Sequence, residues 1–120
     1  MSASKWQDKN GKDYTAHLNL GAATTLTAQL GTDFVHLSAK DLKRVFSKGP
    51  ILFNTMATLH TINTGEAVDP EAFIQAIDVD TLDRMCNALL DQIAQLHPEL
   101  RTVIAKTRRI VDAATIATRR

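Results

Sequence analysis

Four histidines are the first residues of this chain that could do chemistry, because imidazole binds metals and exchanges a proton near neutral pH. No two of them are four residues apart, and no His-Glu-x-x-His motif occurs, so the sequence does not support a zinc site. Surface or half-buried polar positions are the simpler interpretation of all four. They are His17, His36, His60 and His97.

Three closely spaced aspartates, Asp78, Asp80 and Asp83, look like the start of a calcium-binding loop. The glycine of the tight turn and the closing glutamate of an EF-hand are missing at the required positions. We therefore interpret these carboxylates as a helix cap and as charge partners for the positive end of a helix.

The only cysteine, Cys86, rules out an intramolecular disulfide and a cysteine metal cage. It lies on the apolar stripe of the strongest helical segment, where we expect a small core residue rather than a nucleophile. The five glycines are isolated from one another, which argues against a phosphate-binding loop. We predict no enzyme active site, no metal and no cofactor.

The basic C-terminal segment is the one candidate for binding a partner. Helical spacing spreads its cations over more than one face, and it has no aromatic residue on which a base could stack. Three interpretations stay open: a solvated helix end, a surface for a protein partner, and a nucleic-acid contact. The cations are Arg101, Lys106, Arg108, Arg109, Arg119 and Arg120.

Composition and charge limit the classes of fold and function that the chain can have. The chain has 120 residues, 44% hydrophobic and 5% aromatic, which indicates one domain with a mainly aliphatic core. Its net charge of +1 argues against a dedicated nucleic-acid binder. Residues 1–60 carry +3, residues 61–97 carry −6 and residues 98–120 carry +4. Such blocks predict head-to-tail attraction within the fold or between copies, with ordinary solvated helix faces as the alternative.

Membrane and export signals are missing from the sequence. No apolar run reaches about 18 residues, the length needed to span a bilayer. The first 13 residues are polar and lack the apolar region of a secretory signal. We expect a cytoplasmic protein that is neither secreted nor bound to a membrane.

The pattern of elements predicts a mostly α-helical fold of five or six short helices in one compact domain. Residues 1–13 are predicted to be a flexible tail, or else the first arm of a hairpin that turns at Asn10-Gly11. Trp6 is expected to dock on the domain itself, with docking on a partner as the alternative. A short strand is expected within residues 14–20, with Leu18 and Leu20 on one face.

The helical core domain is expected over residues 14–97. A first helix should end at Gly31, and a second should begin at Ser38 with a weak capping box. A helix over 51–59 follows, then one that begins at Asp69-Pro70. The strongest helix is expected over residues 80–96.

The apolar stripe of that helix continues past Pro98 with heptad spacing, so we expect a kink or a restart there. Residues 98–120 are predicted to form a basic C-terminal helix or tail that packs weakly. For Leu96 and Leu100 the core is the stronger explanation. The predicted partner-binding residues are Leu96, Leu100, Val103, Ile110, Arg101, Lys106, Arg108 and Arg109.

The stretch from Tyr14 to Phe34 resembles the opening of tail assembly chaperones of long-tailed (siphovirus-type) bacteriophages. It has a short strand, the Gly21-Ala22 pair that begins a helix, and then Gly31 before an apolar residue. A middle apolar helix, an acidic Asp-Pro-Glu-Ala-Phe helix and an Ile-Asp-Val-Asp-Thr-Leu step follow in similar order. The resemblance covers about residues 13–98 and rests on spacing and hydrophobic order.

The resemblance implies a small, mostly helical, non-enzymatic protein of the infected cell's cytoplasm. Such proteins coat the tape measure protein while tail tube protein polymerises around it, and many are extended by a programmed frameshift. Self-association would suit this role. Two other classes stay open: a small helical DNA- or RNA-binding regulator that uses the basic C-terminal segment, and a structural or dimerisation module.

Overall fold

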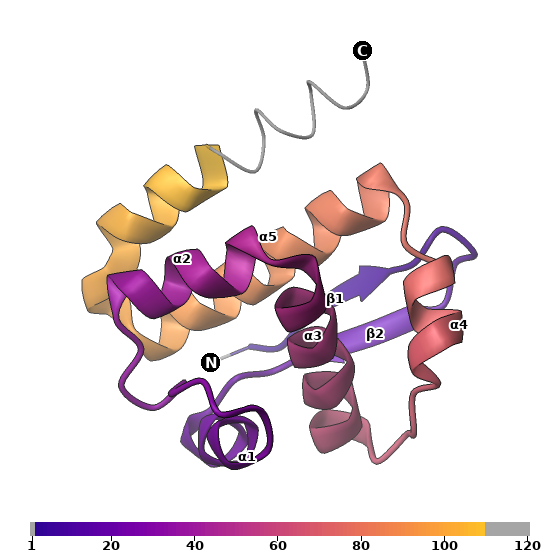
Figure 1. The fold of residues 1–120 in the computed structure, drawn as a ribbon, viewed down its shortest axis with the longest axis horizontal. Coiled ribbons are helices and arrows are strands. Elements are labelled where there is room, and N and C mark those ends of the chain that lie inside the picture. The colour runs from indigo at the N-terminus through magenta and orange to yellow at the C-terminus, as the bar shows by residue number, and fades with distance from the viewer. Residues whose placement is uncertain (1, 110–120) are drawn as a thin grey trace.

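The computed structural model describes residues 2–109, and its first element is an antiparallel hairpin of β1 (Ser4–Gln7) and β2 (Asp13–Ala16) (Figure 1). Trp6 pairs with Tyr14 across the hairpin, and their rings stack with centroids 4.4 Å apart. Gly11 has φ 84°, a conformation that glycine adopts without strain. The hairpin alternative is therefore confirmed, and the prediction of a flexible tail is wrong for residues 4–13. The tail prediction failed because Trp6 is buried against the domain.

The segment after β2 differs from the expected strand. β2 ends at Ala16, and Leu18 is buried, but Leu20 is the first residue of the next helix and is 61% exposed. Asn19 causes the change, because its side chain accepts a hydrogen bond from the Ala22 backbone N–H and caps the helix.

The helices follow in the expected order and confirm a mostly α-helical domain. The bounds are α1 (Leu20–Leu30), α2 (Ala39–Ser47), α3 (Gly49–Thr64), α4 (Pro70–Gln75) and α5 (Val79–Leu96), then a 3₁₀ turn η1 (Pro98–Leu100) and helical residues 101–109. Ser38 and Asp41 form a reciprocal capping box at the start of α2. Gly31 ends α1 in the left-handed conformation, as predicted.

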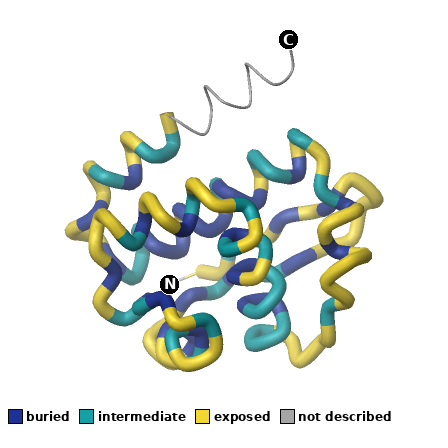
Figure 2. Tube along the Cα trace, in the orientation of Figure 1, coloured by how far each residue is buried: buried dark blue, intermediate teal, exposed yellow. Residues whose placement is uncertain are grey.

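The hairpin lies between two helices, with β1 along α5 and β2 along α3. α1 and α2 both pack against α3. The core between these elements is built mainly from aliphatic side chains, and Figure 2 shows the buried positions lining the inner sides of the helices and strands. Gln92 on α5 is one of several polar residues that are also buried. It accepts from the Leu18 N–H and donates to the Ser2 carbonyl and to Ser4 Oγ.

The chain turns sharply after α5, as Pro98 predicted. His97 Nε2 donates to the Phe34 carbonyl oxygen at 2.9 Å, which fixes the turn against the loop before α2. Residues 101–109 then fold back, and Leu100 and Ile104 join the core. None of the helices within residues 2–109 is long and apolar enough to cross a membrane.

Candidate functional site

The apolar residues predicted to bind a partner mostly face inward. Leu100 is 9% exposed and belongs to the core, while Leu96 and Val103 are half-buried and pack against it. Ile110 lies outside the described residues. In this structure the core explanation therefore holds for Leu96 and Leu100, and Val103 must be added to it. Leu96 and Val103 keep part of their surface exposed, whereas Leu100 is covered by the core.

The cations of the same segment face solvent. Arg101, Lys106 and Arg109 are exposed. Arg108 is half-buried, and its Nη2 donates to Asp91 Oδ1 on α5 at 2.7 Å. Arg119 and Arg120 lie outside the described residues. Of the four cations predicted to bind a partner, three are therefore exposed to solvent.

A second group of cations lies on α2 and just after it. Leu42 and Val45 point into the core, so the outer side of the helix is left to charged residues. These cations contribute to the +3 charge of residues 1–60, but no prediction placed them together on one surface. Their spacing of three, one and four residues on a capped helix was the available signal. They are Lys40, Lys43, Arg44 and Lys48, all exposed.

Six of the thirteen acidic residues of the chain lie on segments at the other end of the molecule. In Figure 1, α2 and residues 101–109 lie toward the left of the longest axis, whereas α4 and the start of α5 lie toward the right. The longest extent is 36 Å. The acids of the loop before α4, of α4 and of the start of α5 are Glu66, Asp69, Glu71, Asp78, Asp80 and Asp83. The charge blocks of the sequence thus become a separation of charge along the molecule.

The aspartates once compared with a calcium loop serve the start of α5. The Thr81 backbone N–H donates to Asp78 Oδ1 at 2.8 Å, and this bond holds the pKa of the Asp78 carboxyl below its usual value. Among residues 2–109, no group of three or more His, Cys, Asp or Glu side chains could hold a metal ion. The cap interpretation therefore fits the structure.

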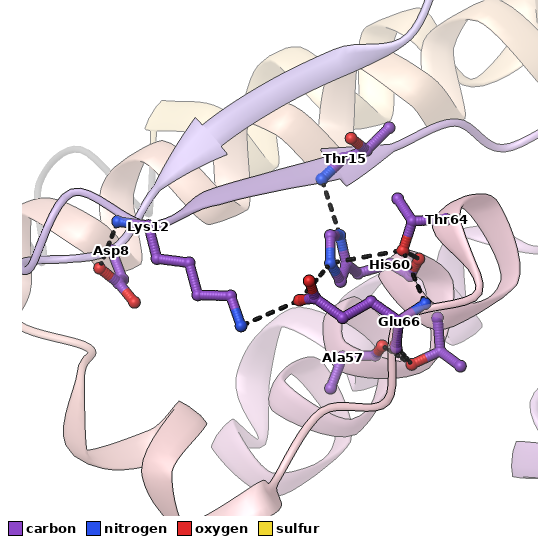
Figure 3. Close-up of polar contacts among 8 residues, drawn as sticks. Asp8, Lys12, Thr15, Ala57, His60, Thr64 and Glu66 are labelled. Carbon is purple, nitrogen blue, oxygen red and sulfur yellow. Dashed lines mark hydrogen bonds and ion pairs between the residues drawn. The ribbon is translucent and has the colours of Figure 1, made fainter.

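A polar cluster around His60 joins the hairpin to the end of α3 (Figure 3). The Thr15 backbone N–H donates to His60 Nδ1 at 3.0 Å, so Nε2 carries the proton of the neutral ring and lies 3.1 Å from Glu66 Oε1. The same carboxylate oxygen pairs with Lys12 Nζ at 2.9 Å. The Tyr14 ring meets the imidazole at its edge, with centroids 4.9 Å apart.

This cluster has the parts of a catalytic His–Glu pair, but its geometry makes it a structural clamp. A general base needs a free ring nitrogen in reach of substrate, and His60 uses Nδ1 for a backbone bond. The hydrogen bond from Lys12, followed by that from His60, holds the pKa of the Glu66 carboxyl below its usual value. The clamp therefore ties β2, the end of α3 and the loop before α4 together.

Cys86 lies in the core, as its place on the apolar stripe predicted. It is 3% exposed, and burial, reinforced by the charge of Asp83, raises the pKa of its thiol to about 12. A thiol with such a pKa stays protonated at neutral pH, so it is a poor nucleophile.

A groove that no sequence pattern predicted runs between α3 and α4. Its volume is about 200 Å³, and its floor is apolar, formed by Phe53, Ala57, Val68 and Phe73. Ile74 stands at its edge and is 50% exposed. The groove could not be predicted because its walls come from separate elements that only the folded chain brings together.

No family model, curated protein or solved structure matches this chain.

Proposed function

We propose that this protein is a non-enzymatic tail assembly chaperone of a long-tailed bacteriophage. It would bind the tape measure protein in the host cytoplasm while tail tube protein assembles around it. The order of elements supports the proposal: the Gly21-Ala22 pair lies in the first turn of α1, Asp69-Pro70 begins α4, and Asp78 caps α5. This is the order that the resemblance implies.

The observation that carries the proposal is the separation of charge along the longest axis. A coat on a long client requires many modest contacts that form and break, because a single tight contact would stop the tube from displacing it. Opposite charges on exposed side chains provide such contacts, since each pair contributes at most about 1 kcal/mol. The cationic end of one copy would face the acidic end of the next, a head-to-tail arrangement that can repeat along the client.

Co-expression with a tape measure protein tests this function. We expect the client to be soluble with this chain and to aggregate without it. A variant with Lys40→Glu, Lys43→Glu and Arg44→Glu should protect the client less, because the cationic end is reversed. A matched control reverses Lys5, an exposed cation of β1. A client that stays insoluble with the wild-type chain would contradict the proposal.

The exposed cations of α2 favour one further candidate, a DNA- or RNA-binding regulator. Such binding would weaken steeply with salt, because each neutralised phosphate releases a counterion. Titration of labelled duplex DNA and single-stranded RNA at two salt concentrations tests it, and salt-sensitive binding would favour the regulator. A closed dimer that ignores salt would instead favour the dimerisation module.

A further inference from the structure

One side of the groove between α3 and α4 is formed by helices without charged residues. The sequence holds no Lys, Arg, Asp or Glu over residues 18–32 or over residues 49–65. These stretches form α1 and α3, which pack against each other. The exposed side of a helix ordinarily carries charged residues, as α2 does, so two adjacent helices without any charge form an exception.

The groove also carries an exposed apolar side chain. Among residues 2–109, two large hydrophobic side chains are exposed: Ile74 lines the groove, and Leu20, at the start of α1, does not. Phe53 and Ala57 are half-buried on the groove floor, where a neighbour would cover them. Polar but uncharged side chains, including Gln29, complete the wall.

Acidic residues border the groove on the α4 side. Asp69 and Glu71 flank Pro70, which lines the groove, and both are exposed. Glu66 precedes them on the loop and already pairs with Lys12. The lining holds no cation to balance these carboxylates. An apolar ligand with positive charges beside its apolar side therefore matches the groove, whereas an acidic one is repelled.

The size of the groove selects the kind of ligand. Pockets for cofactors and drug-sized molecules usually measure about 300–1,000 Å³. A cavity of roughly 150 Å³ takes a benzene ring. A groove of about 200 Å³ that opens beside Ile74 thus has room for one or two large side chains and a further contact at its edge. A helix with apolar residues along one side can place one or two of them in such a groove and a further one at its edge.

We infer that the groove between α3 and α4 binds the apolar side of a cationic amphipathic helix from a partner protein. The inference rests on the proposed function in one respect, because the client of the chaperone would supply that helix. The client would then bind at a surface separate from the cationic side of α2. Its binding segment would be an amphipathic helix with positive charges beside its apolar side.

Two synthetic peptides test the charge rule with the full chain. Each has about 18 residues, or five helical turns, with leucines on one side. One carries lysines on the other side and the second carries glutamates. We expect the lysine peptide to bind at least about tenfold more tightly, which corresponds to about 1.4 kcal/mol. Backbone NMR shifts should map its site to Asn54, Ala57 and Ile74. Equal binding of both peptides, or shifts confined to α2, would overturn the inference.

A pair of matched variants tests the location. Ile74→Ser removes the apolar contact at the groove without adding a charge, whereas Leu20→Ser makes the same kind of change at the other exposed apolar residue, which does not line the groove. We expect Ile74→Ser to weaken binding of the lysine peptide by about tenfold or more. Leu20→Ser should bind like the wild type. Circular dichroism confirms that both variants fold, and equal losses in the two would overturn the inference.

The outcomes separate this inference from the proposed function. If neither peptide binds but the chain keeps a tape measure protein soluble, the groove assignment fails and the chaperone stands. If the lysine peptide binds the wild type and not Ile74→Ser, while the tape measure protein still aggregates, the groove stands and the chaperone fails.

Discussion

The cationic side of α2 and the apolar groove between α3 and α4 differ in what they offer a partner. On α2, Leu42 and Val45 face the core and the outer side is charged. On α3, apolar side chains also reach the outer side, where Phe53 and Ala57 are half-exposed. Salt screens attraction between exposed charges but leaves apolar contact largely intact. The first region is therefore suited to weak, salt-sensitive contacts and the second to a more specific contact.

The largest expected effect on stability comes from replacing Trp6, whose ring supports the groove floor. Trp6 is 3% exposed, stacks on Tyr14 and meets the edge of Phe73, which is part of the groove floor. We expect Trp6→Ala to lower the free energy of unfolding by about 3–5 kcal/mol. Urea unfolding measures the loss, and Trp6→Phe, which keeps a ring, should lose less. An unchanged stability of Trp6→Ala would show that the hairpin does not support this region.

The clamp at the end of α3 gives the next largest effect. His60→Ala leaves the Thr15 N–H without its partner, which costs about 1–3 kcal/mol. His36→Ala is the control, because His36 is exposed, and its effect should stay within about 0.5 kcal/mol. Unfolding curves of the two variants compare them directly. Equal effects would mean that His60 does not hold the groove side to the hairpin.

Acid should loosen the groove side before the α2 side. The pKa of Glu66 is lowered in the folded chain from its ordinary value of 4.5, so its contribution is present above that value and is lost as the pH falls through the folded pKa. Hydrogen exchange of the Thr15 amide should therefore speed up as the pH falls below 4.5, after correction for intrinsic exchange. Glu66→Gln should remove most of this acid response, and an unchanged response would contradict the clamp.

The smallest effect on stability is expected at the cationic side. Lys40, Lys43 and Arg44 are exposed, and each reversal to Glu should change the free energy of unfolding by no more than about 0.5 kcal/mol. Thermal unfolding of the single variants checks this. A large loss of stability would mean that these cations stabilise the fold and are not free to bind a partner. The two regions would then no longer differ in this respect.

The sequence predicted what depends on local chemistry and missed what depends on contact between distant segments. Ser38, Gly31 and Asp78 act within a turn of their own positions, so the helix ends they set were predictable. Whether residues 4–7 form a strand depends on Trp6 meeting Tyr14 and Phe73, and no local pattern decides that. Val103 has the spacing of a free stripe and still packs on the core after the turn at Pro98.

The same difference between local and long-range features separates the binding surface that was predicted from the one that was missed. The exposed cations of residues 101–109 were predicted, because long charged side chains on a helix stay in water. The groove was missed, since α1, α3 and α4 contribute to its walls. The one sign of the groove in the sequence is the lack of charged residues over residues 18–32 and 49–65. That lack predicts an uncharged surface but not a groove.

Light scattering with size-exclusion chromatography, across protein concentration and at two salt levels, tests the central claim that separated charge drives head-to-tail association. We expect the mass to rise with concentration at low salt and to fall to the monomer in about 1 M NaCl, where the Debye length is about 3 Å. The variant with Lys40→Glu, Lys43→Glu and Arg44→Glu should stay monomeric at both. A wild-type chain that is monomeric at every concentration, or a variant that associates like it, would contradict the account.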